Sequence, residues 1–341
     1  MWPLLPSALA LLAMAAVIVV AGVRLTRVAD ALAERTGLGD AIGGALLLGA
    51  VTSLPGNVTV ATGALSGDAA FALANPVGGV ALQTVWLAIA DLVYRRVNLE
   101  HAAASLQNVL QSVLLLALLA VPVIAYATPT LMVGWVHVLT LAIPLLYGYG
   151  LVLLRQMQRD PMWQPTRTAQ TADDDSAGEN PEETAGDQPP LRRLWFTLAG
   201  LGVIVGVAGW IVGRAGLSLV AATGLEGGLV GFTFTTAISS LPELVVLMTA
   251  VRMGQLTLGI GNIVGGNVYD MLMLALADVA YLEGSVYSAA GQDSLILVGG
   301  TLLITAILIA GLLARHRRGI GFEGVSIPVI YLSIIALMVW A

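Results

Sequence analysis

Two acidic residues stand inside long apolar stretches of this chain, where a carboxylate is costly to bury. Glu243 follows Pro242, and Asp270 follows a Gly-Gly-Asn segment that ends at Asn267. Taking an unpaired carboxylate out of water is expensive, and acids buried in a membrane usually mark the path of an ion. Glu243 and Asp270 are therefore predicted to be the charged ligands of a cation.

Two prolines supply further oxygen ligands. Proline lacks an amide hydrogen and its ring displaces the carbonyl four residues earlier, so Pro55 frees the carbonyl of Val51 and Pro242 frees that of Ile238. Polar side chains surround both breaks: Thr52, Ser53, Asn57, Thr235, Thr236, Ser239 and Ser240. Carbonyl, hydroxyl and carboxylate oxygens are the ligands that hard cations prefer. Each hydroxyl taken alone could instead bond back to its own helix.

The prolines belong to an internal duplication. Residues 37–91 align without a gap onto residues 224–278, at a constant offset of 187, and 18 of the 55 positions are identical. The shared segments are Ser-Leu-Pro, Asn-x-Val-Gly-Gly and Ala-Asp, the last ending at Asp91 and Asp278. Glycine packing motifs can recur by chance among apolar helices. The matched Ser, Pro, Asn and Asp residues favour a true repeat.

The composition is that of a membrane protein. The chain is 57% hydrophobic and 11% charged, whereas globular domains carry about 25% charged residues. Ten apolar runs approach the ~20 residues that span a bilayer, which predicts an all-α polytopic fold. They are 2–23, 38–65, 70–93, 103–125, 128–154, 194–213, 217–250, 256–281, 294–314 and 320–340. The second and seventh runs are too long for one straight crossing, which predicts broken helices there. The first run lacks the positive start of a signal peptide, so a retained helix is favoured.

The arginines predict the orientation. All 15 basic residues are Arg, and the ten spans place 14 of them on one side and Arg214 alone on the other. The positive-inside rule then puts both termini outside and the 155–193 segment in the cytoplasm. This segment is acidic and rich in proline, which is typical of a disordered linker. A cation-sensing loop is the alternative, although the segment lacks the ligand spacing of an EF-hand.

The linker separates two halves, 1–154 and 194–341, of five predicted spans each. Five crossings separate equivalent spans of the two copies, so the copies are predicted to be inverted relative to each other. Inverted repeats with helix breaks and acids at matching places are typical of secondary transporters.

The chain has no Lys for a phosphate-binding loop and no Cys for a thiolate site. We therefore expect no enzyme, no cofactor and no nucleic-acid partner; the expected partners are inorganic cations and the lipid bilayer of a prokaryotic plasma membrane. The sequence does not predict an oligomeric state.

Both copies resemble the α-repeats of the cation/Ca²⁺ exchanger superfamily, the sodium/calcium exchangers and their relatives. Residues 239–244, Ser-Ser-Leu-Pro-Glu-Leu, and residues 261–270, Gly-Asn-Ile-Val-Gly-Gly-Asn-Val-Tyr-Asp, resemble the second repeat; residues 52–55 and 75–79 resemble the first. The resemblance implies an alternating-access antiporter with its ion site at the centre of a two-fold bundle. The ligands that it implies are Thr52, Ser53, Ser239, Ser240, Glu243 and Asp270.

The first copy departs from the family pattern. Gly56 stands where the family usually has Glu, and Gly-Gly replaces Gly-Ser in both copies. Gln83 occupies the position of the first copy that is equivalent to Asp270 in the second. Two carboxylates balance one Ca²⁺, or two monovalent cations or protons, whereas three Na⁺ would leave excess charge in a low dielectric. The predicted activity is exchange of Ca²⁺ for H⁺ or Na⁺. A monovalent cation/proton exchanger, an uncoupled channel and a transport-dead relative are the alternatives.

Five further polar residues are candidates for the ion pathway or its gates: Asp91, Asp278, Gln83, Asn57 and Thr236. The two acids lie eight residues beyond the Gln83/Asp270 position, about 12 Å along a helix. Inversion would put Asp91 towards the cytoplasm and Asp278 towards the outside. The alternative is a helix-end carboxylate paired locally, for Asp91 with the arginines at 95 and 96. His137 could relay protons, although a packing role is favoured.

Overall fold

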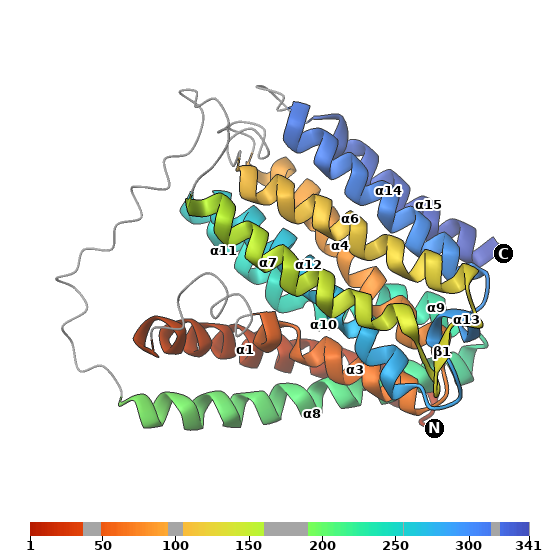
Figure 1. Ribbon diagram of the computed structural model, residues 1–341. Helices are drawn as coiled ribbons and strands as arrows, with labels where there is room; N and C mark the ends of the chain where they lie inside the picture. Colours follow the sequence, from red (N-terminus) through yellow and green to blue (C-terminus); the bar gives the residue numbers. More distant parts are fainter. Residues whose placement is uncertain (37–48, 95–104, 160–189, 255, 315–320, 341) are drawn as a thin grey trace.

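The protein is built almost entirely from helices (Figure 1). The computed structural model describes residues 1–36, 49–94, 105–159, 190–254, 256–314 and 321–340. Within these residues, eight helices are long and apolar enough to cross a membrane, or up to nine when a bent pair counts as one span. The predicted all-α polytopic membrane fold is confirmed. Of the ten predicted spans, 38–65 begins in residues 37–48, which lie outside the described part of the chain.

Helices that carry the two repeat copies form the core. The first copy supplies α3 (Leu54–Leu65) and α4 (Ala69–Tyr94). The second copy supplies α9 (Gly227–Val230), the π-helical η3 (Gly231–Thr235), α10 (Thr236–Ser239), α11 (Leu241–Met253) and α12 (Leu256–Ala280). α4 is the most enclosed of the long apolar helices, with 94% of its apolar window buried. α12 packs against both α3 and α4, so the two copies meet at the centre of the molecule.

Both copies begin a new helix at the Ser-Leu-Pro segment. In the second copy the chain bends by 51° between the helices on either side of Ser240, and Pro242 lies in the first turn of α11. In the first copy α3 begins at Leu54, with Pro55 in its first turn. Proline is tolerated there because the first N–H groups of a helix have no intrahelical partner. The predicted break within 217–250 is confirmed. Ser53 is the N-cap residue of α3, and Ser240 is the N-cap residue of α11.

Two helices of 33 residues each form a separate layer along one side of the molecule. α1 (Leu4–Thr36) and α8 (Leu191–Thr223) lie side by side and run in opposite directions (Figure 1). At 1.5 Å per residue, each helix is about 50 Å long, which exceeds the ~30 Å hydrocarbon core of a bilayer. Large apolar side chains such as Leu12 and Val203 are exposed on this layer, as a lipid-facing surface requires.

The junction predicted between the spans 194–213 and 217–250 is wrong. α8 continues to Thr223, where Gly224 takes a positive φ of 73° and ends the helix. Arg214 therefore lies within α8 and not in a loop. The neighbouring glycine serves packing: a Cβ atom on Gly213 would lie 2.8 Å from Cβ of Thr62 in α3. Small residues let two helices approach closely, and in sequence they look the same as turn glycines.

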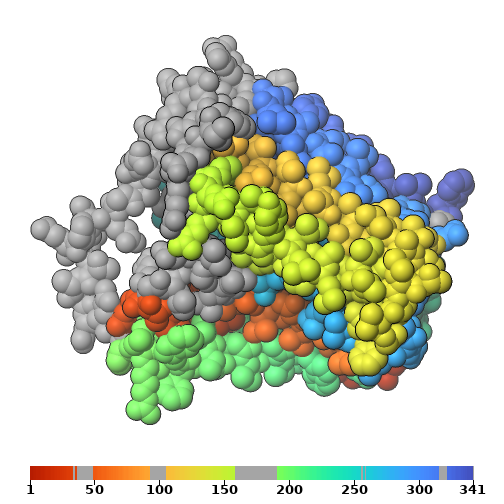
Figure 2. All heavy atoms as spheres, viewed as in Figure 1, coloured from red at the N-terminus to blue at the C-terminus, as the bar shows by residue number. Residues whose placement is uncertain are grey.

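The remaining helices surround the core. They are α6 (Leu106–Ala127), α7 (Ala142–Arg159), α13 (Val286–Ala289), α14 (Asp293–Ala314) and α15 (Phe322–Trp340). In the space-filling view, side chains of α6, α7 and α8 make up much of the visible surface, and α12 is seen only in small areas (Figure 2).

A short hairpin between α6 and α7 corrects the predicted span 128–154. β1 (Met132–Val133) pairs with β2 (Val136–His137), and the 3-10 helix η1 (Val138–Leu141) follows. Gly134 has a φ of +65°, which favours glycine, so the apolar chain turns back here before the membrane helix begins. The predicted linker 155–193 is helical at both ends, in α7 and α8, and its residues 160–189 lie outside the described part.

Candidate cation site

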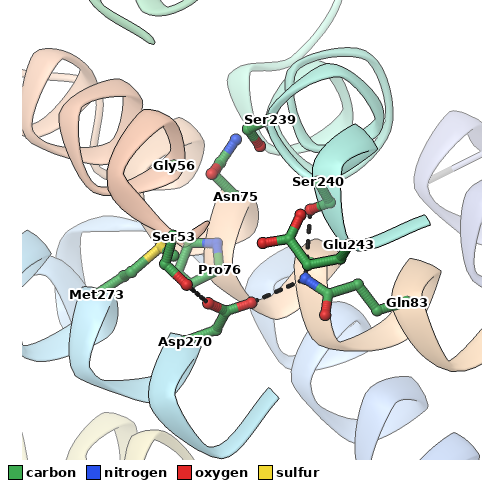
Figure 3. A pocket seen from close by; sticks show the side chains of 11 residues that line it. Ser53, Gly56, Asn75, Pro76, Gln83, Ser239, Ser240, Glu243, Asp270 and Met273 are labelled. Atoms are coloured by element: carbon green, nitrogen blue, oxygen red, sulfur yellow. Dashed lines mark hydrogen bonds between the residues drawn. The ribbon is translucent and has the colours of Figure 1, made fainter. Parts of the chain in front are cut away.

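A small polar pocket lies where α3, α4, α11 and α12 meet (Figure 3). About 240 Å³ of space not occupied by atoms, including space open to the surroundings, lies between these helices. Its lining comes from both repeat copies: Ser53, Gly56, Asn75, Pro76, Gly79, Gln83, Ser239, Ser240, Glu243, Asp270 and Met273. Five of the six predicted ligands are thus brought together, and Gln83 joins them. Thr52, Asn57, Thr236, Asp91 and Asp278 are not among the lining residues.

Asp270 is held by two hydrogen bonds from the first copy. Ser53 Oγ donates to its Oδ1 at 2.5 Å, and Gln83 Nε2 donates to its Oδ2 at 2.9 Å. The Asp270 side chain is 3% exposed, so both bonds are made away from bulk water. Hydrogen bonds to an ionised carboxylate are roughly twice as strong as neutral ones. The first copy, which has Gly56 and Gln83 at the positions of the two pocket acids, therefore orients the acid of the second.

The contacts across the pocket pair equivalent positions of the two copies. Gln83 and Asp270 are 187 residues apart, the offset of the repeat, and they bond to each other directly. Ser53 binds Asp270 while its equivalent Ser240 binds Gln83, with 3.4 Å between Ser240 Oγ and Gln83 Nε2. A two-fold axis passing between two equivalent residues produces this kind of pairing. It also explains why the N-cap serines bond across the pocket, since neither caps its own helix.

Glu243 is the second acid of the pocket. It lies in the first turn of α11, where the partial positive charge of the helix N-terminus favours a carboxylate. The residue is 5% exposed, and within the described residues its Oε2 atom has no hydrogen-bond partner. The pocket lining contains no Arg or His that could neutralise either acid. The described residues hold no group of three or more acidic or imidazole side chains around one point. The arrangement has two acids and a set of hydroxyls, and it lacks an internal counter-charge.

The hydroxyls beside the helix breaks divide into two groups. Ser239 lines the pocket and donates weakly, at 3.3 Å, to the carbonyl of Thr236 in its own helix. Thr236 instead donates to the carbonyl of Asn75 at 2.9 Å and packs the π-helical segment against α4. Thr52 donates back to the carbonyl of Gly49 at 3.3 Å. The two groups differ in position: the three serines line the pocket, and Thr52 and Thr236 do not.

Met273 is a lining residue that the sequence analysis did not identify. A Cβ atom on Gly56 would lie 3.0 Å from Met273 Cε and 3.2 Å from its Sδ. The thioether therefore fills the space opposite Gly56, where the second copy has Glu243. One signal was available: Met273 follows Asp270 by three residues and so shares its helix face. Asn75 and Pro76 were also missed as lining residues, although both stand in the repeat.

Comparison with known families shows to which family the chain belongs. The family model described as "Sodium/calcium exchanger protein" matches residues 6–156 and 193–340, which together make up most of the chain. The chain belongs to this family.

Relatives of this exchanger-family chain are distant in sequence. CaxA of Alkalimonas amylolytica, which carries the name of an antiporter, is 28% identical over 142 residues. The match covers 40% of this chain, and the chain spans only 44% of that relative's length.

Solved structures share the fold over nearly the whole chain. The crystal structure of the H⁺/Ca²⁺ exchanger CAX has a TM-score of 0.71 at 14% identity, covering 100% of this chain and 86% of that one. The sodium-calcium exchanger NCX_Mj has a TM-score of 0.61 at 15% identity, covering 98% of each chain. The family and these neighbours are exchangers, not enzymes, and their ions are transported ligands.

In this exchanger-family chain, Asp278 is engaged in a structural contact. It is fully buried and accepts hydrogen bonds from the backbone N–H of His137 at 2.9 Å, from that of Val286 at 2.8 Å, and from the hydroxyl of Thr140. These bonds join the hairpin and α13 to the end of α12. His137 is itself satisfied, because its Nδ1 accepts from Leu139 N and its Nε2 lies 2.8 Å from the carbonyl of Thr128. Both residues fit the packing alternative better than a gate or relay.

Asp91, the equivalent acid of the first copy, is 3% exposed near the end of α4. The arginines at 95 and 96, its partners in the alternative interpretation, lie outside the described residues.

Proposed function

We propose that this protein is a cation antiporter that binds one Ca²⁺ between Glu243 and Asp270 and exchanges it for protons. The observation that carries the proposal is the pair of buried carboxylates that line one pocket with no basic side chain among the lining residues. Such a pair needs an external positive charge, since an unpaired buried carboxylate is expensive. One divalent cation or two protons neutralise it equally, and that equivalence is the basis of exchange.

The proposed ligands are the oxygens that line the pocket. Glu243 and Asp270 provide the charge, and Ser53, Ser239 and Ser240 provide neutral oxygens of the kind that hard cations accept. Thr52 is left out, because it is not among the residues that line the pocket. Within the described residues the site has no third carboxylate, which argues against simultaneous binding of three Na⁺.

The pairing of equivalent residues across the pocket supports an inverted repeat of the halves 1–154 and 194–341. In such a bundle the site lies near the bilayer midplane and is exposed alternately to the two sides. We propose the orientation that the arginines favour, with both termini outside and residues 155–193 in the cytoplasm. The absence of native cysteine makes the test clean: single cysteines at residues 3 and 175 should react with impermeant reagents from opposite sides of the membrane. Labelling of both from the same side would contradict the orientation.

Ion flux into proteoliposomes tests the function. We expect uptake of ⁴⁵Ca²⁺ when the lumen is acidic relative to the bath, and little uptake without an ion gradient. Uptake driven by a Na⁺ gradient but not by a pH gradient would make Na⁺ the counter-ion. Flux that needs no counter-ion would identify a channel, and absence of all flux would identify a transport-dead relative. A matched exchange of Na⁺ for H⁺ without Ca²⁺ flux would point to a monovalent exchanger on this scaffold.

A further inference from the structure

The candidate cation site contains a sulfur atom in addition to its oxygens. Among the described residues that line the pocket, Met273 alone carries sulfur. A Cβ atom on Gly56 would lie 3.2 Å from Met273 Sδ and 4.0 Å from Ser239 Oγ. A Cβ atom on Gly79, another lining residue, would lie 3.5 Å from Asp270 Oδ2. The second repeat copy therefore lines the pocket with a thioether, a hydroxyl and a carboxylate.

Helix geometry and the missing side chain at residue 56 hold this sulfur beside the acid. Met273 follows Asp270 by three residues on α12, so the two side chains share one face of the helix. The Met273 side chain extends from α12 towards α3, where Gly56 leaves room for it (Figure 3). Met273 is 4% exposed, so its thioether lies among protein groups and the pocket and not in bulk water.

The internal duplication does not account for a sulfur atom in the pocket. Trp86 is the residue of the first copy that is equivalent to Met273, at the offset of 187, and it is not among the lining residues. Glu243 is the second-copy equivalent of Gly56. One set of equivalent positions thus has glycine with methionine, and the other has glutamate with tryptophan. The sulfur is a feature of one copy only.

Sulfur changes which cations suit the pocket. Hard cations such as Ca²⁺ and Mg²⁺ take oxygen ligands, so a thioether adds little to their binding. Thioether sulfur is polarisable and favours softer metal ions. A divalent cation that accepts oxygen and sulfur together would therefore use more of this lining than Ca²⁺ does. Cd²⁺ meets this requirement, because it has the charge of Ca²⁺, is close to it in size and binds sulfur more strongly.

We propose that Met273 is a selectivity residue whose sulfur is a ligand for Cd²⁺, so that the pocket accepts Cd²⁺ as a second transported ion. The inference rests on the cation site proposed above, because Glu243 and Asp270 balance the two charges of Cd²⁺ as they do those of Ca²⁺. Cd²⁺ replaces Ca²⁺ one for one, and the counter-ions exchanged for it are unchanged. Met273 adds no charge to the site; it shifts the preference between two ions of equal charge.

Replacement of Met273 by leucine distinguishes a ligand from a packing residue. Leucine keeps the apolar volume and removes the sulfur. Calorimetric titration of the purified Met273→Leu variant should therefore show Cd²⁺ binding weakened about tenfold and Ca²⁺ binding changed no more than about threefold. Met271→Leu is the matched control and should change neither affinity, because Met271 is a fully buried residue of the same helix that does not line the pocket.

Two results of this titration would overturn the inference. A parallel loss of both affinities in Met273→Leu would show that Met273 only packs the site. An unchanged affinity for Cd²⁺ would show that its sulfur is not a ligand.

X-ray absorption at the cadmium edge gives a second readout that needs neither transport nor Ca²⁺. The chain has no Cys, so any sulfur bound to Cd²⁺ comes from methionine. Cd²⁺ in the wild type should have a sulfur atom among its nearest neighbours, and Cd²⁺ in Met273→Leu should have oxygen alone. An all-oxygen shell in the wild type would overturn the inference and leave the proposed Ca²⁺ site intact. A sulfur-containing Cd²⁺ site in a protein that does not bind Ca²⁺ would support the role of Met273 and refute the proposed Ca²⁺ exchange.

Discussion

Replacing Gln83 with glutamate would restore an acid to the first repeat copy without changing the size of the side chain. The Nε2 atom of Gln83 lies 2.9 Å from Oδ2 of Asp270, so Gln83→Glu would turn a hydrogen-bond donor into a second carboxylate at the same place. At an effective dielectric constant of about 20, two unit charges about 3–4 Å apart repel by about 4–6 kcal/mol. Repulsion of that size keeps one proton shared between two neighbouring carboxylates when no cation is bound.

The expected consequence is a change in proton release. Binding of Ca²⁺ to the Gln83→Glu variant must displace the shared proton, so this variant should release about one proton more per Ca²⁺ than the wild type. Calorimetric titration at one pH, in buffers of different ionisation enthalpy, measures that number. Gln83→Met is the matched control, because it removes the amide without adding a charge, and it should release as many protons as the wild type. Equal proton release by wild type and Gln83→Glu would refute the placement of Gln83 and Asp270 in one cation site.

Three further changes test other contacts of the site and its surroundings. Ser53→Ala removes a hydrogen bond to a carboxylate, worth about 1.5–3 kcal/mol, whereas Ser240→Ala removes a long neutral contact worth about 1 kcal/mol or less. Calorimetry should therefore show a larger loss of Ca²⁺ affinity for Ser53→Ala than for Ser240→Ala. Equal losses in the two variants would contradict this asymmetry. Gly56→Glu alone should lower thermal stability by about 1–3 kcal/mol through overpacking against Met273, and Met273→Ala in the same chain should recover most of it; a single variant as stable as the double one would show that Met273 does not fill this space. Asp278→Asn should lower the free energy of unfolding by about 2–3 kcal/mol, because an amide group takes the place of the carboxylate that accepts three hydrogen bonds. An unchanged melting temperature together with blocked transport would instead favour a gating role for Asp278.

Helix breaks and the acids beside them could be predicted because their chemistry is local. Proline disrupts a helix whatever surrounds it, so Pro242 alone indicates the bend that the structure has at Ser240. The offset of the repeat likewise predicts which residues are equivalent. Direct bonding between Gln83 and Asp270 was not predicted, because it depends on how closely the two copies approach.

Helix boundaries were predicted poorly where glycine has two uses. Gly213 in α8 packs against Thr62, and Gly134 turns the hairpin with a positive φ. In sequence the two are indistinguishable, since both are small residues within apolar runs. Only the neighbouring helix decides which use applies, and this information is tertiary.

Some side chains of the site could be identified from local chemistry alone, and others only from their tertiary contacts. Glu243, Asp270 and the serines were predicted because their chemistry is unusual in an apolar segment. Met273 was not, because a methionine in an apolar helix has no distinguishing chemistry until Gly56 is placed opposite it.

Calcium binding by the two neutralised variants tests the central claim most directly. Calorimetric titration of purified wild type, Glu243→Gln and Asp270→Asn compares three proteins that differ by one charge in a pocket with no basic lining residue. The account predicts one Ca²⁺ per wild-type chain and a loss of affinity of a hundredfold or more, about 3 kcal/mol, in each variant, since each leaves the bound cation with an unbalanced charge. Unchanged Ca²⁺ binding in both variants would contradict it.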